Sequence, residues 1–481
     1  MQGTPELAGG SKIDPWREKA VRYNREIHAL RARVKEVKLG REEFKRRLRI
    51  SNRERACLKE QNARLLRRVA ALDQSTAIRH HSYSAEQIRL FVLLRQYGGM
   101  SLRACRHAIL ILTTVLHFEF ELPSITTLRY WEMKLGLDQL RRVASNRHAH
   151  ALLLDESISL GGQRALVLLG VDLVRYDFRT PLRMEDTEVL YIGLRSSWTA
   201  VQIAEAIEQV RQRGYKLVYG CSDRGANLRK VLFDSNLVHV SDCTHALAKM
   251  LEKRYRHDPV YLEFCAHTSR IKRRLVLSEY AQYAPPHRRD KARFLNLDAL
   301  SDWAVVMLAQ LKSGALGPQH EKPFAELNWL LNYESFIVEL SAKITLHHQV
   351  LKVLKHHGLN PQTRYEVQQL VQNAPVEEGF REQIIAYVRS TERLLPRQGS
   401  ILCCSDVLES MFGKLKYQSP SNRLVGLTDA VLNLANYGKH FSVEQIKSSL
   451  ESIRIFDLKE WRRKNVPDTA LQKRRRLKNT G

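Results

Sequence analysis

Three carboxylates stand where secondary-structure elements are expected to end or to present a single face. Asp155 closes the apolar run ALLLDES, and Asp223 closes a second run, KLVYGCSDRG. Glu409 lies far downstream in CCSDVLESMFGKLK, whose periodicity predicts a helix. Two hard divalent cations held by shared carboxylates can stabilise both the attacking and the leaving oxygen of an in-line phosphoryl displacement. The three residues therefore predict a site for two Mg²⁺ or Mn²⁺ ions that acts on phosphodiesters.

The elements that must position these carboxylates follow one another as strand, strand, strand, helix, strand, helix, strand, helix. The first helix, SWTAVQIAEAIEQVRQRG, has Ser197 as its expected N-cap and Gly214 as its stop. The other segments, in chain order, are ALLLDES, RALVLLGVDLV, EVLYIGL, the strand before Asp223, NLRKVLF, LVHVSD and a helix beginning near Thr244. Both aspartates are thus expected at strand ends where their side chains can converge.

This order of elements around the carboxylates resembles the catalytic core of DDE transposases, which has a ribonuclease-H-like fold. The string DCTHALAKML, about twenty residues after Asp223, is similar to the Cys/Asp-x-x-His element of hAT-type transposases. In that group a long helical insertion precedes the final glutamate, and residues 256–398 are rich in helical periodicity here. The resemblance implies Asp155, Asp223 and Glu409 as catalytic metal ligands, with His245 as a supporting residue.

Two lysines follow Glu409 on the same predicted helix. Lys416 lies two turns along the face of Glu409, and Lys414 lies between them. A lysine there resembles the one that touches terminal DNA phosphates in several bacterial insertion-sequence transposases. Those relatives carry an arginine four residues before the glutamate, whereas this chain has Ser405.

Each of these residues has a plainer interpretation. A strand-ending aspartate is most often a turn or cap residue, and His245 could simply cap a helix. If the first strand is misplaced, Glu156 or Asp172 replaces Asp155. The cysteine and histidine pattern Cys243, His245, Cys265 and His267 could suggest zinc, although its spacing is tight and the segment between is helical. The seven cysteines show no paired framework, and the tandem Cys403-Cys404 favours buried thiols in a reducing compartment.

Composition points to a nucleic-acid partner independently of the motifs. Lys and Arg total 78 against 51 Asp and Glu, which gives a formal net charge of +27 and suits a protein that contacts many phosphates. No apolar stretch approaches the roughly twenty residues that span a bilayer, and the N-terminus MQGTPELAGGSK has no hydrophobic signal region. The sequence therefore predicts a cytoplasmic, nucleoid-associated protein that binds double-stranded DNA and no membrane.

Residues 1–76 have the pattern of a basic coiled coil. Apolar residues recur on one heptad position at Trp16, Tyr23, Leu30, Val37, Phe44, Leu58, Leu65 and Leu72, and four residues later at Ala20, Ile27, Val34, Leu48 and Val69. Arg41, Arg55 and Asn62 occupy the second position, where a polar residue usually fixes register and strand number. This seam predicts a homo-oligomer, in the form of a dimer. The alternative is a solvated amphipathic helix that packs against the rest of its own chain.

Residues 77–148 predict a helix-turn-helix-like DNA-binding unit of three helices. Ser84 and Gln87 form a capping box for the first helix, which ends at Gly98-Gly99, and Pro123-Ser124 opens the third. The side chains best placed for base edges or phosphates are Ser124, Thr126, Thr127 and Arg129. The expected buried stripe is Ile125, Leu128 and Trp131.

The helical insertion carries a basic run beside Pro285-Pro286 that could clamp DNA, formed by Arg288, Arg289, Lys291 and Arg293. Trp303 and Trp329 could stack on an unpaired base, although their apolar neighbours favour a core role. The C-terminal segments WRRKN and QKRRRLKN predict a disordered, electrostatic tail.

The expected fold is therefore an α/β ribonuclease-H-like core interrupted by an all-α insertion and preceded by a coiled coil and a helix-turn-helix unit. The expected boundaries are 1–76, 77–148, 149–255 for the first part of the core, 256–398 for the insertion, 399–445 for the final part of the core and 446–481 for the tail. The resemblance implies metal-dependent cleavage at element ends and strand transfer into target DNA. The rivals are an inactive, transposase-derived DNA-binding or scaffolding protein and a structure-selective DNA nuclease.

Overall fold

The chain divides into two compact units, Met1–Ala77 and Ile78–Gly481. The computed structural model describes residues 15–116, 121–160, 162–223, 225–287, 297–316, 321–394, 399–418 and 426–479. Within these ranges, no helix combines the length and the apolar character needed to cross a membrane.

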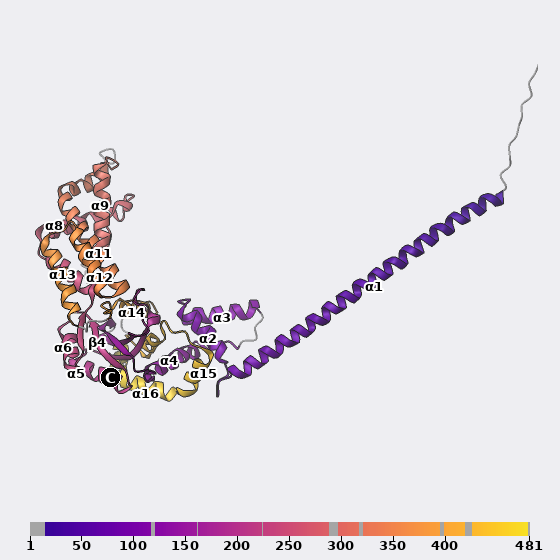
Figure 1. Cartoon of the computed structure of the whole chain (residues 1–481), viewed down its shortest axis with the longest axis horizontal. Helices are drawn as coiled ribbons and strands as arrows, with labels where there is room; N and C mark the ends of the chain where they lie inside the picture. Colours follow the sequence, from indigo (N-terminus) through magenta and orange to yellow (C-terminus); the bar gives the residue numbers. More distant parts are fainter. Residues whose placement is uncertain are drawn as a thin grey trace, which may run out of the picture. The chain divides into compact units, whose positions relative to one another are not determined.

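The first unit is built on one unbroken helix, α1 (Pro15–Thr76), of 62 residues (Figure 1). Every side chain from Trp16 to Leu65 is exposed, including the apolar seam predicted from the heptads; Trp16 is 75% exposed and Val37 is 70% exposed. The predicted helix is thus confirmed, and its apolar seam is available for a partner.

The second unit contains a five-stranded mixed sheet in the order β3-β2-β1-β4-β5. Its strands are β1 (Ala149–Leu160), β2 (Gln163–Asp172), β3 (Thr187–Arg195), β4 (Lys216–Ser222) and β5 (Val238–Ser241). Strands β1, β2 and β3 pair antiparallel, whereas β4 runs parallel to β1 and β5 runs parallel to β4. The chain segments predicted as strands therefore form the sheet, in the predicted succession.

Helices cover both faces of this sheet, so the central strands are apolar at successive positions. On one face, Leu152 and Leu154 pack with the apolar side of α5 (Ala200–Gln212) and with α6 (Ala226–Asp234). On the other face, Leu153 and Cys221 pack with α7 (Cys243–Tyr255), α11 (Glu334–His357) and α14 (Asp406–Gln418). This second face is the one on which the carboxylates lie.

The predicted N-cap of α5 was wrong by two residues. Thr199, and not Ser197, accepts a hydrogen bond from the Gln202 amide, and Gln202 bonds back to the Thr199 amide. This reciprocal capping box outweighs the earlier serine, because Gln202 stands three residues after Thr199. Gly214 ends the segment with φ of +89°, as predicted.

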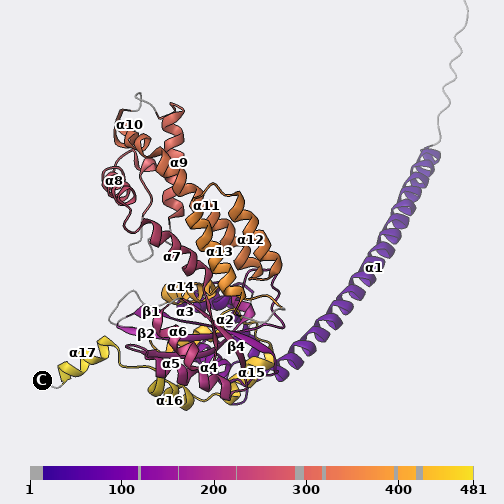
Figure 2. The ribbon, with the colours of Figure 1, turned by 60° about the vertical axis from the view of Figure 1, so that its left-hand side comes forward.

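A group of helices is inserted between β5 and α14 (Figure 2). Besides α7 and α11 it contains α8 (Pro259–Leu275), α9 (Asp298–Lys312), α10 (Glu321–Leu327), α12 (Pro361–Asn373) and α13 (Glu378–Glu392). The fully buried Lys343 of α11 forms ion pairs with Glu339 and Glu377, and its ammonium lies over the Tyr255 ring. This one cation joins α7, α11 and the start of α13.

The two insertion tryptophans lie in packed surroundings, as the core interpretation predicted. Trp303 donates a hydrogen bond to the Tyr283 carbonyl at 3.0 Å. The Trp329 ring stacks on His267 with ring centroids 4.9 Å apart and contacts Phe264 and Tyr333.

Three helices that precede the sheet pack with helices from the C-terminal end of the chain. They are α2 (Ala85–Gln96), α3 (Leu102–Leu116) and α4 (Ile125–Arg141), and they meet α15 (Val443–Ser452) and α16 (Ile455–Asn465); α17 (Ala470–Asn479) follows. The predicted capping box of Ser84 and Gln87 is present. Leu128 and Trp131 are buried as predicted, but Ile125 is 39% exposed because it begins the helix.

The prediction of a disordered tail was wrong for the described residues. The segment WRRKN lies in α16, in which Leu458 is buried, and the segment QKRRRLKN lies in α17.

Candidate active site

Asp155 lies inside β1, which continues to Leu160, so the prediction that it ends its strand was wrong; Asp223 directly follows the end of β4, as predicted. Leu153 of β1 pairs with Cys221 of β4. Asp155 stands two residues after Leu153, and Asp223 stands two residues after Cys221. Because alternate side chains of a strand point to the same face, both carboxylates are expected on the face that carries Leu153 and Cys221. A register shift between Asp155 and Ile158 marks a bulge in β1 directly after the first aspartate, and such bulges often re-aim a side chain near a functional site.

Local backbone geometry holds the second aspartate. The Oδ1 atom of Asp223 accepts a hydrogen bond from the Gly225 amide at 2.9 Å. A Cβ at Gly225 would lie 2.9 Å from the same oxygen, so a larger residue there would make the carboxylate shift. The turn into α6 thereby fixes one oxygen of Asp223.

Glu409 returns to this region on α14, which contacts β1. Leu408, Met411 and Phe412 of the same helix are buried, whereas the Glu409 side chain is 53% exposed. Its Oε1 atom lies 3.8 Å from Nε2 of His245. Partial burial and the negative charges of Asp406 and Asp242 raise the pKa of Glu409, while the charge of His245 opposes that rise.

His245 sits in the first turn of α7 and is oriented by a buried carboxylate. Its Nδ1 atom is 3.0 Å from Oδ1 of Asp242, so Nε2 is the ring nitrogen that faces Glu409. The hydrogen bond that His245 donates to Asp242 raises the pKa of His245 to about 9, helped by the charges of Asp242, Glu409 and Asp223. His245 therefore carries a positive charge at neutral pH in this arrangement and lies within the field of two of the three predicted metal ligands.

Asp242 is fully buried and connects the two separated halves of the site. It caps α7 by accepting a hydrogen bond from the His245 amide at 2.8 Å, and its Oδ2 accepts from the Ser405 amide at 2.7 Å and the Ser405 hydroxyl at 2.9 Å. Burial alone would raise the pKa of Asp242, but the hydrogen bonds from His245 and Ser405 outweigh it and hold the pKa low. Sequence analysis did not assign these roles to Asp242 and Ser405, although an aspartate three residues before a helical histidine is a recognisable N-cap signal.

Among the described residues, the group whose possible ligand atoms lie within 4.8 Å of one another is Asp242, Cys404 and Asp406; Asp155, Asp223 and Glu409 are not gathered as closely. The hydrogen-bonding capacity of this group is already used. Asp406 accepts from the Thr244 hydroxyl at 2.9 Å and pairs with Lys355 at 2.5 Å. A hydrogen bond with Cys243, together with burial, raises the pKa of the Cys404 thiol well above its usual value. Each of these residues thus has partners within the protein; Asp242 and Cys404 are buried, whereas the side chain of Asp406 is 35% exposed.

Of the two alternatives to Asp155, the structure gives Asp172 a different role. Asp172 pairs with His150 at the other end of β1, and its Oδ1 accepts from the Val174 amide at 3.0 Å, as a turn residue does. The side chain of Glu156 lies outside the described residues. The zinc pattern is divided between separate surroundings, because His267 stacks on Trp329 while Cys243 is buried at the start of α7.

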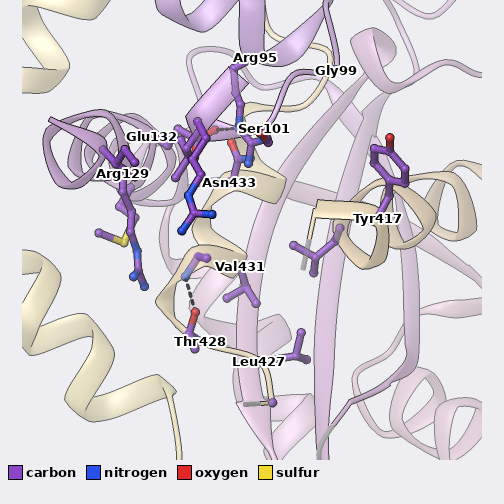
Figure 3. Close-up of a pocket in the computed structure, with 17 residues that line it drawn as sticks. Arg95, Gly99, Ser101, Arg129, Glu132, Tyr417, Leu427, Thr428, Val431 and Asn433 are labelled. Atoms are coloured by element: carbon purple, nitrogen blue, oxygen red, sulfur yellow. Dashed lines mark hydrogen bonds and ion pairs between the residues drawn. The ribbon is translucent and has the colours of Figure 1, made fainter. Parts of the chain in front are cut away.

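The predicted DNA-reading residues of α4 are engaged with other groups. The Ser124 hydroxyl accepts from the Thr127 amide at 3.0 Å and lies 2.9 Å from the Thr127 hydroxyl. Arg129, whose side chain is 42% exposed, pairs with Asp429. It lines a cavity of about 630 Å³ between α4, the end of α14 and residues 426–433 (Figure 3), where Glu132 pairs with Arg95 at 2.5 Å.

The lysines after Glu409 lie on the outside of α14. The Lys414 ammonium is 5.8 Å from the centroid of the Tyr437 ring, and Lys416 is exposed. The basic run of the insertion, Arg288, Arg289, Lys291 and Arg293, lies outside the described residues.

No protein-family model and no curated protein sequence matches this chain. Among solved structures, the chain is similar to the Drosophila P element transposase in a strand transfer complex, with 12% sequence identity and a TM-score of 0.42. That similarity covers 79% of this chain and 98% of the other. A likeness this weak does not establish a family, so the function must be argued from the residues themselves.

Proposed function

We propose that this protein is a DNA transposase of the DDE type, with Asp155, Asp223 and Glu409 as its catalytic metal ligands. The observation that supports the proposal is the register between β1 and β4, in which Leu153 pairs with Cys221, the residues two positions before Asp155 and Asp223. A third carboxylate, Glu409, returns from almost two hundred residues later through a helix that contacts β1. His245 connects the two parts, with Glu409 at 3.8 Å and Asp223 within its electrostatic field.

The sheet supports a ribonuclease-H-like core. Three antiparallel strands are followed by two parallel ones, and the order β3-β2-β1-β4-β5 puts the first strand at the centre. In this arrangement the carboxylates of β1 and of the end of β4 fall in the middle of the sheet, where helices on both faces hold the strands rigid.

The donor set fits Mg²⁺ or Mn²⁺. The three residues offer only carboxylate oxygens, which hard cations prefer, and the exposure of Glu409 leaves room for substrate. Two such ions would supply stabilisation of the attacking and leaving oxygens of a phosphodiester. β1, the end of β4 and α14 would hold the three carboxylates, and Asp242 orients His245 so that its positive charge can offset the negative charge of Glu409.

DNA is the partner that suits the net charge of +27. We further propose that the unit containing α2, α3 and α4 helps to bind element ends through Ser124, Thr127 and Arg129. Lys414, Lys416 and the run Arg288, Arg289, Lys291 and Arg293 would contact the DNA backbone. The seam of α1 would pair two copies of the chain, and a nucleoid-associated, cytoplasmic location follows from this partner.

Cleavage of DNA by matched variants tests the proposal. The substrate is a plasmid carrying the gene with its natural flanking DNA, incubated with the full chain in Mg²⁺ and assayed for broken and joined products. Asp223→Asn should lose nearly all cleavage while keeping DNA binding, because it removes a ligand charge without changing the shape. Asp234→Asn, which neutralises an exposed carboxylate at the end of α6, should behave as the wild type.

The same experiment separates the rivals. A wild type that binds DNA without breaking it supports the scaffolding protein, and cleavage without any joined product supports the nuclease. Full cleavage by Asp223→Asn removes the DDE assignment altogether.

A further inference from the structure

Helix α7 carries a line of basic residues that starts at the candidate active site. His245 lies in its first turn, Lys249 follows four residues later, Lys253 eight residues later and Arg256 eleven residues later. These spacings place the four side chains along one side of the helix. Figure 2 shows α7 leading from the sheet towards the inserted helices, so the line runs away from the carboxylates.

This line forms one wall of a groove between α7 and α13. The groove has a volume of about 700 Å³; it is lined on the α7 side by Lys249, Lys253, Arg256 and His257 and on the α13 side by Gln383, Ala386 and Ser390. Of the described residues that line it, Glu252 is the acidic one; it pairs with Lys249 at 3.0 Å and Arg256 at 3.5 Å. One carboxylate against three permanent cations leaves the wall positively charged.

The groove is fixed to the active site by a direct hydrogen bond. The hydroxyl of Tyr387, a lining residue on α13, donates to the Ser241 carbonyl at 2.9 Å. Ser241 ends β5, and the next residue is Asp242, which orients His245. The two walls and the carboxylate site therefore belong to one connected framework. The cations remain accessible at its surface, since the side chain of Lys249 is 66% exposed and that of Arg256 is 61% exposed.

The dimensions of the line decide which phosphate ligand fits it. Eleven residues of α-helix extend over about 16 Å, whereas each strand of duplex DNA carries one phosphate per about 3.4 Å of the duplex axis. A compact phosphate group would be surrounded by cations that converge on one point, but these cations are spread along the helix, as the phosphates of a DNA backbone are. We propose that the groove between α7 and α13 binds the phosphodiester backbone of DNA adjoining the cleavage site.

This inference rests on the proposed function, because it assumes that DNA lies at the carboxylates. The inference adds a path for the DNA strand, which would run from the carboxylates past His245 and along α7 into the insertion. The insertion would then hold DNA on α7 and α13, in addition to any contact made by the basic run at 288–293.

Salt-dependent binding of the full chain to a duplex of arbitrary sequence tests the groove. Each phosphate contact contributes about 0.9 to the slope of log affinity against log salt. The triple variant Lys249→Ala, Lys253→Ala, Arg256→Ala should therefore lower the slope by about 2.7 between about 50 and 200 mM salt. The single variant Lys253→Ala should lower it by about 0.9; because Lys253 is exposed and has no role in the fold, it guards against misfolding of the triple variant.

A matched control removes the same charge elsewhere in the insertion. Arg270→Ala, Lys272→Ala, Arg273→Ala takes three cations from α8, and its slope should stay within about one contact of the wild type. Equal losses in both triple variants would mean a general effect of charge and would overturn the groove. An unchanged slope in the α7 variant, with a wild type that binds DNA, overturns the groove and leaves the proposed function standing. A wild type that does not bind DNA overturns both.

Cross-linking gives the position directly. Cys57 is the exposed cysteine and the other six are buried, so a photo-activated cross-linker can be attached to Lys253→Cys in a Cys57→Ser background. If DNA lies in the groove, the Lys253→Cys protein should give a strong DNA cross-link and the Arg273→Cys protein a weak one. The reverse pattern contradicts the proposed path.

Discussion

Ser405 shows how a single residue can join two distant segments of a site. It precedes α14, and both its amide and its hydroxyl donate to the buried carboxylate of Asp242 at the start of α7. Asp242 in turn orients His245. A residue without a hydroxyl at this position would keep only the contact from the backbone amide.

Removing the hydroxyl should therefore destabilise the protein. Ser405→Ala leaves a buried, charged oxygen without one of its donors, and such a loss costs about 1.5–3 kcal/mol in the free energy of unfolding. Urea unfolding followed by circular dichroism measures it. Ser269→Ala, which removes an exposed hydroxyl that bonds only within α8, should change stability by less than about 0.5 kcal/mol. Equal stability of both variants would show that the Ser405 contact contributes nothing.

His347 should make the stability of the chain depend on pH. Neither ring nitrogen of this buried residue in α11 has a hydrogen-bond partner among the described residues. Burial lowers its pKa to about 4, and the positive charges of His348 and Lys355 act in the same direction against Asp298. The neutral ring is thus favoured in the folded chain, and its contribution is complete above the unfolded pKa of about 6.5.

As pH falls from 6.5 towards 4, His347 binds a proton in the unfolded chain but stays neutral in the folded chain. Stability should then decrease by about 3 kcal/mol, since one pKa unit corresponds to about 1.4 kcal/mol. Denaturant unfolding at pH 7 and at pH 4 measures the change. His347→Leu should weaken this dependence, whereas His28→Leu in the exposed α1 should not. The same dependence in all three proteins would assign it to other groups.

The helices and strands followed from periodicity, because apolar spacing is a local property that burial reinforces. The sheet, α5 and the capping box at Ser84 were predictable in this way. Details that depend on competing partners were not: Thr199 displaced Ser197 as a cap through Gln202, and Leu458 of α16 is buried despite its basic surroundings. For the candidate site, the strands that carry or precede the two aspartates could be found from the sequence, but the end of β1 beyond Asp155 could not. The Asp242–Ser405 connection joins residues 163 positions apart and carries no local signal.

Helix α1 offers a prediction at the scale of one element. If its seam pairs two copies, Leu30→Glu with Val37→Glu should separate them, because charges at facing heptad positions are buried without partners. Val21→Glu with Leu39→Glu makes the same chemical change on exposed apolar residues of α1 that lie off the seam and should leave the assembly intact. Light scattering measures the mass; an unchanged mass in the seam variant places the interface elsewhere.

At the scale of the whole molecule, charge and assembly should act together on DNA binding. α1 contains 19 Lys and Arg against eight Asp and Glu, a large share of the net charge of +27. A second copy held by the seam would double the basic surface that one DNA molecule meets, and linked binding raises affinity without any new contact. Both effects predict steep loss of affinity with salt, at about 0.9 in slope per neutralised phosphate.

Deleting residues 1–76 removes the charge and the partner at once, so it should lower both the affinity for arbitrary duplex DNA and the salt slope. The seam variant Leu30→Glu, Val37→Glu separates the two causes, because it abolishes pairing while keeping every basic residue of α1. If assembly dominates, the seam variant should bind nearly as weakly as the deletion; if charge dominates, it should bind nearly as well as the wild type. The off-seam variant Val21→Glu, Leu39→Glu adds the same negative charge and corrects for it. A deletion whose slope equals that of the full chain would confine the phosphate contacts to residues 78–481 and leave α1 without a role in DNA binding.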